Sequence, residues 1–144
     1  MADASVTAAN VAPVTTGANR TQTATVTAGA TVTAGQTVAK RSDGRWDPAD
    51  CDLSAEAAGS IDRGVALNGA SDGQPLEIVR GGEYDPGFTA TQGVTYVFSG
   101  TAGGVAPSAD LATNDWVVIL GVGNADGNIL LPPGGIFYSG SQVQ

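Results

Sequence analysis

Hydrophobic and polar positions alternate in short runs along this chain, and glycine, proline, asparagine and aspartate separate the runs. The three clearest runs are rich in β-branched and aromatic residues and lie at 94–98, 116–122 and 129–131. Short runs of this kind, bounded by turn residues, are typical of β-strands. The pattern therefore predicts a turn-rich all-β domain organised around this stretch.

Weaker runs predict further strands on both sides of the central stretch. The segment Tyr-Asp-Pro-Gly-Phe at 84–88 predicts a loop instead, because proline and glycine interrupt it. The core is expected to consist mostly of valine, isoleucine, leucine and alanine, since aromatic residues make up only 6% of the chain. The additional strands are predicted at 24–27, 31–32, 37–40, 64–67, 75–79 and 136–138.

The first 24 residues differ from the rest in having few charges and no large side chains. Such a segment alone buries too little apolar area to offset the entropy lost on ordering. It is therefore either a disordered tail or an extended arm that pairs with a partner, and its threonine and valine content favours the arm. The predicted organisation is an extended N-terminal arm at 1–24, a small β-barrel or sandwich at 25–138, and a polar C-terminal tail at 139–144.

The two halves of the predicted domain repeat the same order of turns and apolar runs at a nearly constant spacing. This order indicates two duplicated three-stranded units that close on each other as a small barrel or sandwich. Chance similarity between glycine-, alanine- and threonine-rich segments is the other explanation. The matches are 33–38 with 91–96, Pro48 with Pro107, Gly64-Val-Ala with Gly121-Val-Gly, and Leu76 and Ile78 with Ile129 and Leu131.

The composition argues against an enzyme. The chain has no histidine, which removes the commonest general base and the commonest metal ligand. Its single cysteine, Cys51, excludes an intrachain disulfide and is expected to be a small buried apolar residue. No phosphate-binding loop is present. We therefore expect no catalytic residue and no cofactor.

Four aspartates, Asp43, Asp47, Asp50 and Asp52, have a spacing that raises the possibility of a calcium site. They lack the full EF-hand pattern with its closing glutamate. A solvated acidic loop without a metal is the expected interpretation.

The charge is unevenly distributed along the chain. Residues 1–40 carry a net charge of +1 and residues 41–144 a net charge of −9, which gives −8 in total. The six basic residues are scattered singly, so no nucleic-acid partner is expected. No apolar run approaches the ~20 residues of a membrane span, and no secretory signal precedes the domain. We expect neither a membrane partner nor export by the secretory route.

An ordered set of segments carries a resemblance to a known family. The segments are Val-Thr-Ala-Gly-Gln-Thr-Val at 32–38, Arg-Gly-Val-Ala-Leu-Asn-Gly-Ala-Ser-Asp-Gly-Gln-Pro-Leu at 63–76, Gly-Val-Thr-Tyr-Val-Phe-Ser-Gly-Thr-Ala-Gly-Gly-Val-Ala-Pro at 93–107, Ala-Asp-Leu-Ala-Thr at 109–113 and Val-Ile-Leu-Gly-Val at 118–122. Together they resemble the capsid decoration proteins of tailed bacteriophages, also called cement or head-stabilising proteins. The resemblance covers roughly residues 25–131.

The resemblance implies a structural virion protein, made in the host cytoplasm and located on the outer capsid surface. Small β-barrel modules of this family, often homotrimers, bridge subunits of the major capsid protein. Aromatic residues outside strong strand patterns often serve interfaces, although packing at the end of the barrel is the alternative here. The predicted arm contacts are Val6, Val11, Val14 and Val26, and the predicted subunit contacts are Tyr84, Phe88, Phe137 and Tyr138.

A head-fibre or tail-associated adsorption module that binds cell-surface glycans is the alternative function. Such a module would present exposed aromatic rings beside polar side chains. Two clusters have this composition: Trp46 with Asp43 and Asp47, and Trp116 with Asn114 and Asp115. Both tryptophans are otherwise expected in the core.

Overall fold

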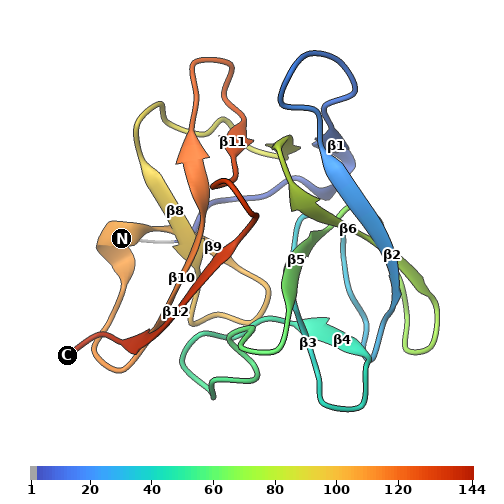
Figure 1. The fold of residues 1–144 in the computed structure, drawn as a ribbon, viewed down its shortest axis with the longest axis vertical. Helices are drawn as coiled ribbons and strands as arrows, with labels where there is room; N and C mark the ends of the chain where they lie inside the picture. Colours follow the sequence, from blue (N-terminus) through green and yellow to red (C-terminus); the bar gives the residue numbers. More distant parts are fainter. Residues whose placement is uncertain (1–2) are drawn as a thin grey trace.

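The chain folds into two antiparallel β-sheets that lie side by side (Figure 1). The computed structural model describes residues 3–144, and within this range the helical elements are two single 3-10 turns, η1 (Ala8–Asn10) and η2 (Ser108–Asp110). The all-β prediction is confirmed. The architecture is sandwich-like, with a five-stranded and a seven-stranded sheet that do not close into one barrel.

The five-stranded sheet forms the N-terminal lobe, which we define as residues 22–81. Its strand order is β2-β6-β5-β3-β4. A single parallel bridge, with the Gly29 N–H donating to the Trp46 carbonyl at 2.7 Å, links its two edges. The strands are β2 (Gln22–Thr27), β3 (Thr37–Lys40), β4 (Trp46–Pro48), β5 (Arg63–Ala66) and β6 (Pro75–Gly81).

The seven-stranded sheet forms the C-terminal lobe, which we define as residues 83–142, and it also takes up one strand from the N-terminus. Its order is β1-β7-β11-β10-β8-β9, and β12 pairs with the free part of β10. The strands are β1 (Val11–Pro13), β7 (Glu83–Pro86), β8 (Thr95–Phe98), β9 (Val105–Pro107), β10 (Trp116–Gly123), β11 (Ile129–Leu130) and β12 (Phe137–Gln142).

The two lobes have the same strand order, in agreement with the predicted duplication. The order β2-β6-β5-β3-β4 corresponds strand for strand to β7-β11-β10-β8-β9, so the repeated unit has five strands instead of three. Val38 pairs with Pro48 on one side and Gly64 on the other. Tyr96 pairs in the same way with Pro107 and Gly121. These registers reproduce the sequence matches at both glycines and both prolines.

The last predicted match is wrong by two residues. Ala66 pairs with Ile78 in the N-terminal lobe, and Gly123 pairs with Ile129 in the C-terminal lobe. Ile129 therefore corresponds to Ile78, whereas the sequence match aligned it with Leu76. A shift of two leaves the alternation of apolar positions unchanged, because side chains in a strand repeat every two residues. Hydrophobic pattern alone cannot detect such a shift.

Two hydrophobic clusters hold the molecule together. One lies within the N-terminal lobe, where Trp46, Leu76 and Ile78 are almost fully buried. The other joins the lobes, because Val65 and Val79 of the N-terminal lobe belong to the cluster that fills the C-terminal lobe. The lobes therefore share a core, and the chain forms one folding unit.

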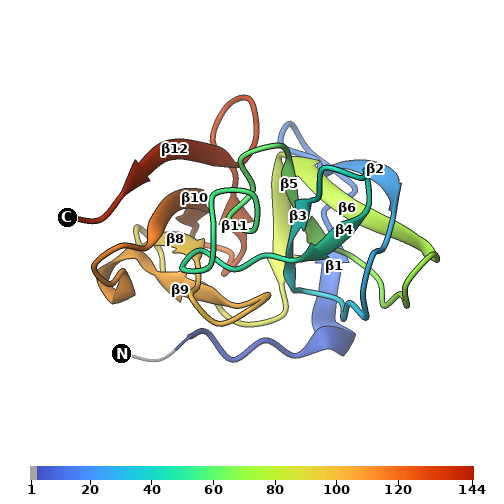
Figure 2. The same ribbon diagram turned by 90° about the horizontal axis from the view of Figure 1, so that it is seen from below.

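The N-terminal segment, defined as residues 3–21, lies across both lobes of its own chain (Figure 2). Its backbone N–H groups at Ala4 and Thr7 donate to the carbonyls of Val105 and Gly87, at 2.8 and 2.9 Å. Strand β1 pairs with β7. The segment thus reaches from β9, at one edge of the seven-stranded sheet, to the opposite edge, which its own strand β1 forms beside β7. These contacts order the segment within its own chain.

Three predicted boundaries are corrected by these pairings. The predicted end of the arm at residue 24 falls inside β2, and Met1 and Ala2 of that arm lie outside the described residues. The predicted polar tail at 139–144 is mostly part of β12, and the predicted loop at 84–88 contains most of β7. Pairing with β11 and β10 makes strands of β7 and β12, whose own residues include proline, aspartate, glycine and serine. The threonine and valine residues of β2 favour a strand by themselves, and its register with β6 begins at Gln22.

Candidate functional site

The outer face of the C-terminal lobe carries three of the five exposed large hydrophobic side chains of residues 3–144. They are Val122, Leu130 and Phe137, with 41%, 38% and 52% of their surface exposed. The other two, Leu53 and Ile61, lie in the turns between β4 and β5.

The strand registers place these three side chains on one face. Val122 lies directly opposite Leu130 on β11 and Thr95 on β8. Phe137 lies opposite Ile119, which lies opposite Val97. Residues two apart in a strand share a face, so Thr95 and Val97 bring both rows to the same side of the sheet. We call the accessible part of this side, made by Ile119, Val122, Leu130 and Phe137, the outer apolar face. Val97 lies on the same side of the sheet but is buried.

The opposite side of β10 points into the core. Val118 and Leu120 are fully buried, and a register irregularity between Ile119 and Gly121 separates them from Val122. A Cβ on Gly121 would lie 2.4 Å from the carbonyl oxygen of Leu130. Glycine at this position therefore allows the close approach of β10 and β11 that brings Val122 and Leu130 together.

Charge is confined to the rim of the outer apolar face. Glu83 lies opposite Leu130, and its carboxylate accepts a hydrogen bond from the Asn128 side-chain amide at 2.8 Å. Thr95 lies on the opposite side of Val122. The row across the sheet is thus threonine, valine, leucine and glutamate, with an uncharged centre. Such a surface suits packing against another protein surface.

The four predicted aromatic contacts separate into different environments. Tyr84 is fully buried, so the prediction that it contacts a second subunit is wrong for the folded chain, and its ring belongs to the core. Phe88 packs edge-to-face on Tyr96 with ring centres 5.4 Å apart. Tyr138 stacks on Trp116 at 6.0 Å and lies 5.9 Å from the Arg63 guanidinium carbon. Of the four, Phe137 lies on the outer apolar face.

The four predicted valine contacts lie against their own chain. Val6 and Val11 cover Gly35 and Gly87, so closely that a Cβ on Gly35 would lie 2.6 Å from Cγ1 of Val6. Val26 packs on the core of the N-terminal lobe. Val14 borders an open groove. These intramolecular contacts leave the interface prediction for the valines without direct support.

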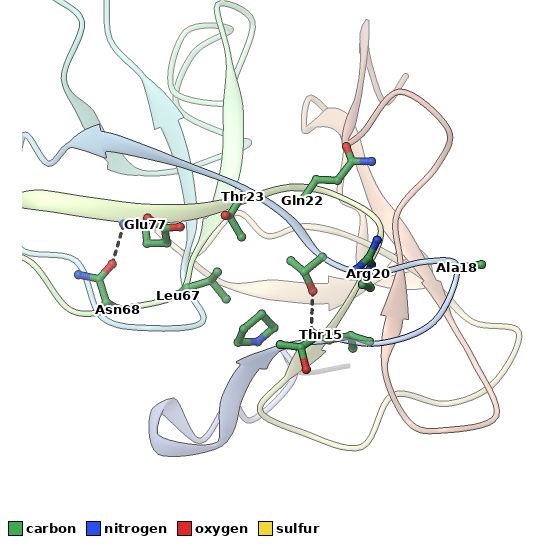
Figure 3. A pocket seen from close by; sticks show the side chains of 11 residues that line it. Thr15, Ala18, Arg20, Gln22, Thr23, Leu67, Asn68 and Glu77 are labelled. Carbon is green, nitrogen blue, oxygen red and sulfur yellow. Dashed lines mark hydrogen bonds between the residues drawn. The ribbon is translucent and has the colours of Figure 1, made fainter.

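The open groove has a volume of about 800 Å³ and lies between the loop after β1, the start of β2 and the turn that joins β5 to β6 (Figure 3). The Thr21 hydroxyl accepts a hydrogen bond from the Val14 N–H at 2.7 Å and donates to the Glu83 carbonyl. The Glu77 N–H donates to Asn68 Oδ1 at 2.7 Å. The described side chains that line the groove include no aromatic ring and no nucleophile paired with a base.

The residues considered for other chemistry occupy structural positions. Cys51 is fully buried, and burial, together with Asp115, Asp52 and Asp50, raises the pKa of its thiol to about 12. The prediction of a small buried cysteine is confirmed. Trp46 is almost fully buried, so it cannot offer its ring to a glycan.

Residues 3–144 contain no group of three or more acidic or cysteine side chains arranged to bind a metal ion. This part of the chain also contains no helix with the length and apolarity needed to cross a bilayer.

Two residues of the outer apolar face, Val122 and Leu130, were not singled out by the sequence. Both belong to runs that predict buried strands, and only the duplication offered a way to recognise them as exposed. It aligns Val122 with Val65, and the fold shows that these two equivalent valines differ in exposure. Comparison of the chain with models of protein families, with curated proteins and with solved structures gave no match.

Proposed function

We propose that this chain is a structural virion protein that decorates the outer surface of a tailed-bacteriophage capsid and stabilises it by bridging subunits of the major capsid protein. The family resemblance of residues 25–131 supports the proposal. The outer apolar face is the observation that carries it, because a sheet with an exposed uncharged centre is suited to packing against another protein chain. The decoration mechanism requires linked copies of the protein as well as contact with the capsid.

The mechanism is additive binding. One copy offers a modest contact area, which by itself supports only weak association. Several linked copies, such as a homotrimer, raise the effective concentration of each further contact, so weak contacts combine into tight attachment. A decoration protein that holds neighbouring capsid subunits in this way opposes their separation.

Backbone pairing with a neighbour is assigned to β2 in place of the N-terminal arm. The N-terminal segment uses its hydrogen bonds within its own chain. Strand β2 stands at the edge of the five-stranded sheet and pairs with β6 on one side. An edge strand of six residues offers unpaired backbone groups for strand addition by a neighbouring chain.

Co-sedimentation tests the proposal. The purified chain would be mixed with capsids assembled from the major capsid protein of the same genome, and with capsids of an unrelated phage as the control. We expect saturable binding to the first capsids and an increase in their resistance to heat. No pelleting with the cognate capsids would contradict the proposal.

A glycan array distinguishes the alternative adsorption module. Binding of the isolated chain to defined glycans, together with no binding to capsids, would favour that module. The burial of Trp46 and the stacking of Trp116 under Tyr138 leave neither predicted glycan cluster with a freely exposed indole.

A further inference from the structure

The duplication places two equivalent faces in one molecule, and the structure covers only one of them. In the N-terminal lobe, Val65 lies opposite Val79 and Thr37. The equivalent row of the C-terminal lobe has Val122 opposite Leu130 and Thr95. The strand order and the direction of each pairing are the same in both rows.

The face of the N-terminal lobe is buried by the other lobe of the same chain. Val65 and Val79 have no exposed surface and belong to the core cluster that the C-terminal lobe supplies. The segment between β11 and β12 closes over this contact, because Arg63 Nε donates to the Ile136 carbonyl at 2.8 Å. The Leu131 N–H donates to the Gly82 carbonyl at 2.9 Å on the same side.

The equivalent face of the C-terminal lobe is left open. Val122 and Leu130 keep about two fifths of their surface exposed, and Phe137 extends the same face with about half. Repeat proteins that end at a free surface usually place polar residues on the outer face of the terminal repeat. This terminal repeat instead keeps the apolar residues that its partner lobe uses for contact.

We infer that the outer apolar face is the contact surface for a second copy of this chain. The molecule itself provides the precedent, since the equivalent face of its first lobe is covered by a lobe of the same kind. The net charge of −8 opposes contact between two copies, and this repulsion is weakest where the contacting surface carries no charge. The centre of the outer apolar face is such a place, with Glu83 only at its rim.

The decoration mechanism requires copies of the chain to associate, and the inference names the surface through which they do so. In this respect the inference rests on the proposed function. Its own evidence is the pair of equivalent faces.

The test compares oligomeric state among charge-matched variants of the full chain. V122K/L130K adds two positive charges to the outer apolar face, and T31K/T113K adds the same two charges at exposed loop positions of the two lobes. Light scattering and sedimentation equilibrium would measure the molar mass against the 14.2 kDa of the monomer. We expect the wild-type chain and T31K/T113K to self-associate, and V122K/L130K to be monomeric or to associate at least about tenfold more weakly.

F137K is a second variant that changes the same face on strand β12. It keeps the test possible if the double substitution prevents folding. Circular dichroism would establish that each variant is folded. A wild-type chain that stays monomeric at its solubility limit would overturn the inference. Self-association that persists in folded V122K/L130K or F137K would also overturn it. The same holds if only L53K/I61K loses self-association, because Leu53 and Ile61 lie outside this face.

Capsid binding separates this inference from the proposed function. A monomeric wild-type chain that still binds its cognate capsid would overturn the inference and leave the decoration function standing. The opposite result is a wild-type chain that self-associates but does not bind its cognate capsid, with self-association abolished in V122K/L130K. That result would support the inference and contradict the decoration function.

Discussion

Val122 occupies in the C-terminal lobe the register position that Val65 occupies in the N-terminal lobe, yet Val65 is fully buried and Val122 is 41% exposed. The same residue type at the same place of a repeated fold thus lies in two environments. The difference arises because the C-terminal lobe covers the first face, whereas the second face ends the stack.

The first prediction compares alanine at the two equivalent valines. V65A should lower the free energy of unfolding by about 2 kcal/mol, because it removes two buried carbon groups and leaves a cavity between the lobes. V122A should cost less than about 1 kcal/mol, since part of that side chain is already in water. Urea unfolding at low protein concentration, where the chain is monomeric, measures both. Equal losses would contradict the asymmetry.

The second prediction concerns the attachment of the N-terminal segment. Gly87 has a φ of +80°, and a Cβ there would lie 2.6 Å from the Thr7 carbonyl oxygen. G87A should therefore displace the segment in addition to straining the backbone. Hydrogen exchange should then show faster exchange at the amides of Ala4 and Thr7.

Gly93 provides the matched control for this substitution. Its φ is +83°, but a Cβ there would meet no heavy atom within 4 Å. G93A should cost only the backbone strain, about 1 kcal/mol, and leave the exchange rates of the N-terminal segment unchanged. If G93A loosened the segment as much as G87A, contact with Thr7 could not be the cause.

The third prediction concerns the buried phenol of Tyr84. Its hydroxyl has no hydrogen-bond partner among the described residues, and burial raises the pKa of the side chain above its ordinary value. Y84F should increase stability at neutral pH by about 1 kcal/mol, because an unsatisfied buried hydroxyl is removed while the ring packing stays. Thermal and urea unfolding would measure this change. A clear loss of stability would show that the hydroxyl makes a stabilising contact.

The fourth prediction is a loss of stability at alkaline pH through Cys51. The thiol has an ordinary pKa of 9.0, which the fold raises to about 12. Between these values the unfolded chain releases the proton and the folded chain keeps it, so the unfolded state gains stability as pH rises. The contribution of Cys51 should be fully present below pH 9 and lost progressively up to about pH 12.

Unfolding curves of the wild-type chain and C51A across this pH range would isolate that contribution. C51A should show a shallower decline than the wild-type chain. At pH 8 a thiol reagent should modify the native protein only at the rate of its opening, because the buried group is protonated. Rapid labelling of the folded chain at pH 8 would contradict the burial of Cys51.

The main strands were predictable because their signals are local. Residues 37–40 coincide with β3, and the run predicted at 94–98 contains β8, since each combines β-branched or aromatic residues with flanking glycines. The weakly marked run at 31–32 forms only an isolated bridge between Val32 and Ala70. Short pieces such as β4 and β9 escaped prediction because pairing with a neighbouring strand, rather than their own residues, makes them strands.

The candidate site was only partly predictable. Phe137 was identified as an aromatic residue outside strong strand patterns, and half of its surface is exposed, whereas its predicted contact with another subunit stays a prediction. Tyr84 met the same criterion but is buried, because β7 is an inner strand between β1 and β11. Composition does not indicate which of the two rings is exposed. The pairing partners of their strands decide this, and these partners lie far apart in the sequence.

The sequence by itself determined that this protein is all-β, that its halves repeat, and that it lacks histidine. These properties follow from residue types and their periodicity, which act over a few neighbouring positions. Only the tertiary structure decided that the N-terminal segment closes over its own sheet and that Val65 is covered while Val122 is open. Burial depends on which distant surfaces meet, and two identical local patterns acquire different environments when only one of them has a lobe packed against it.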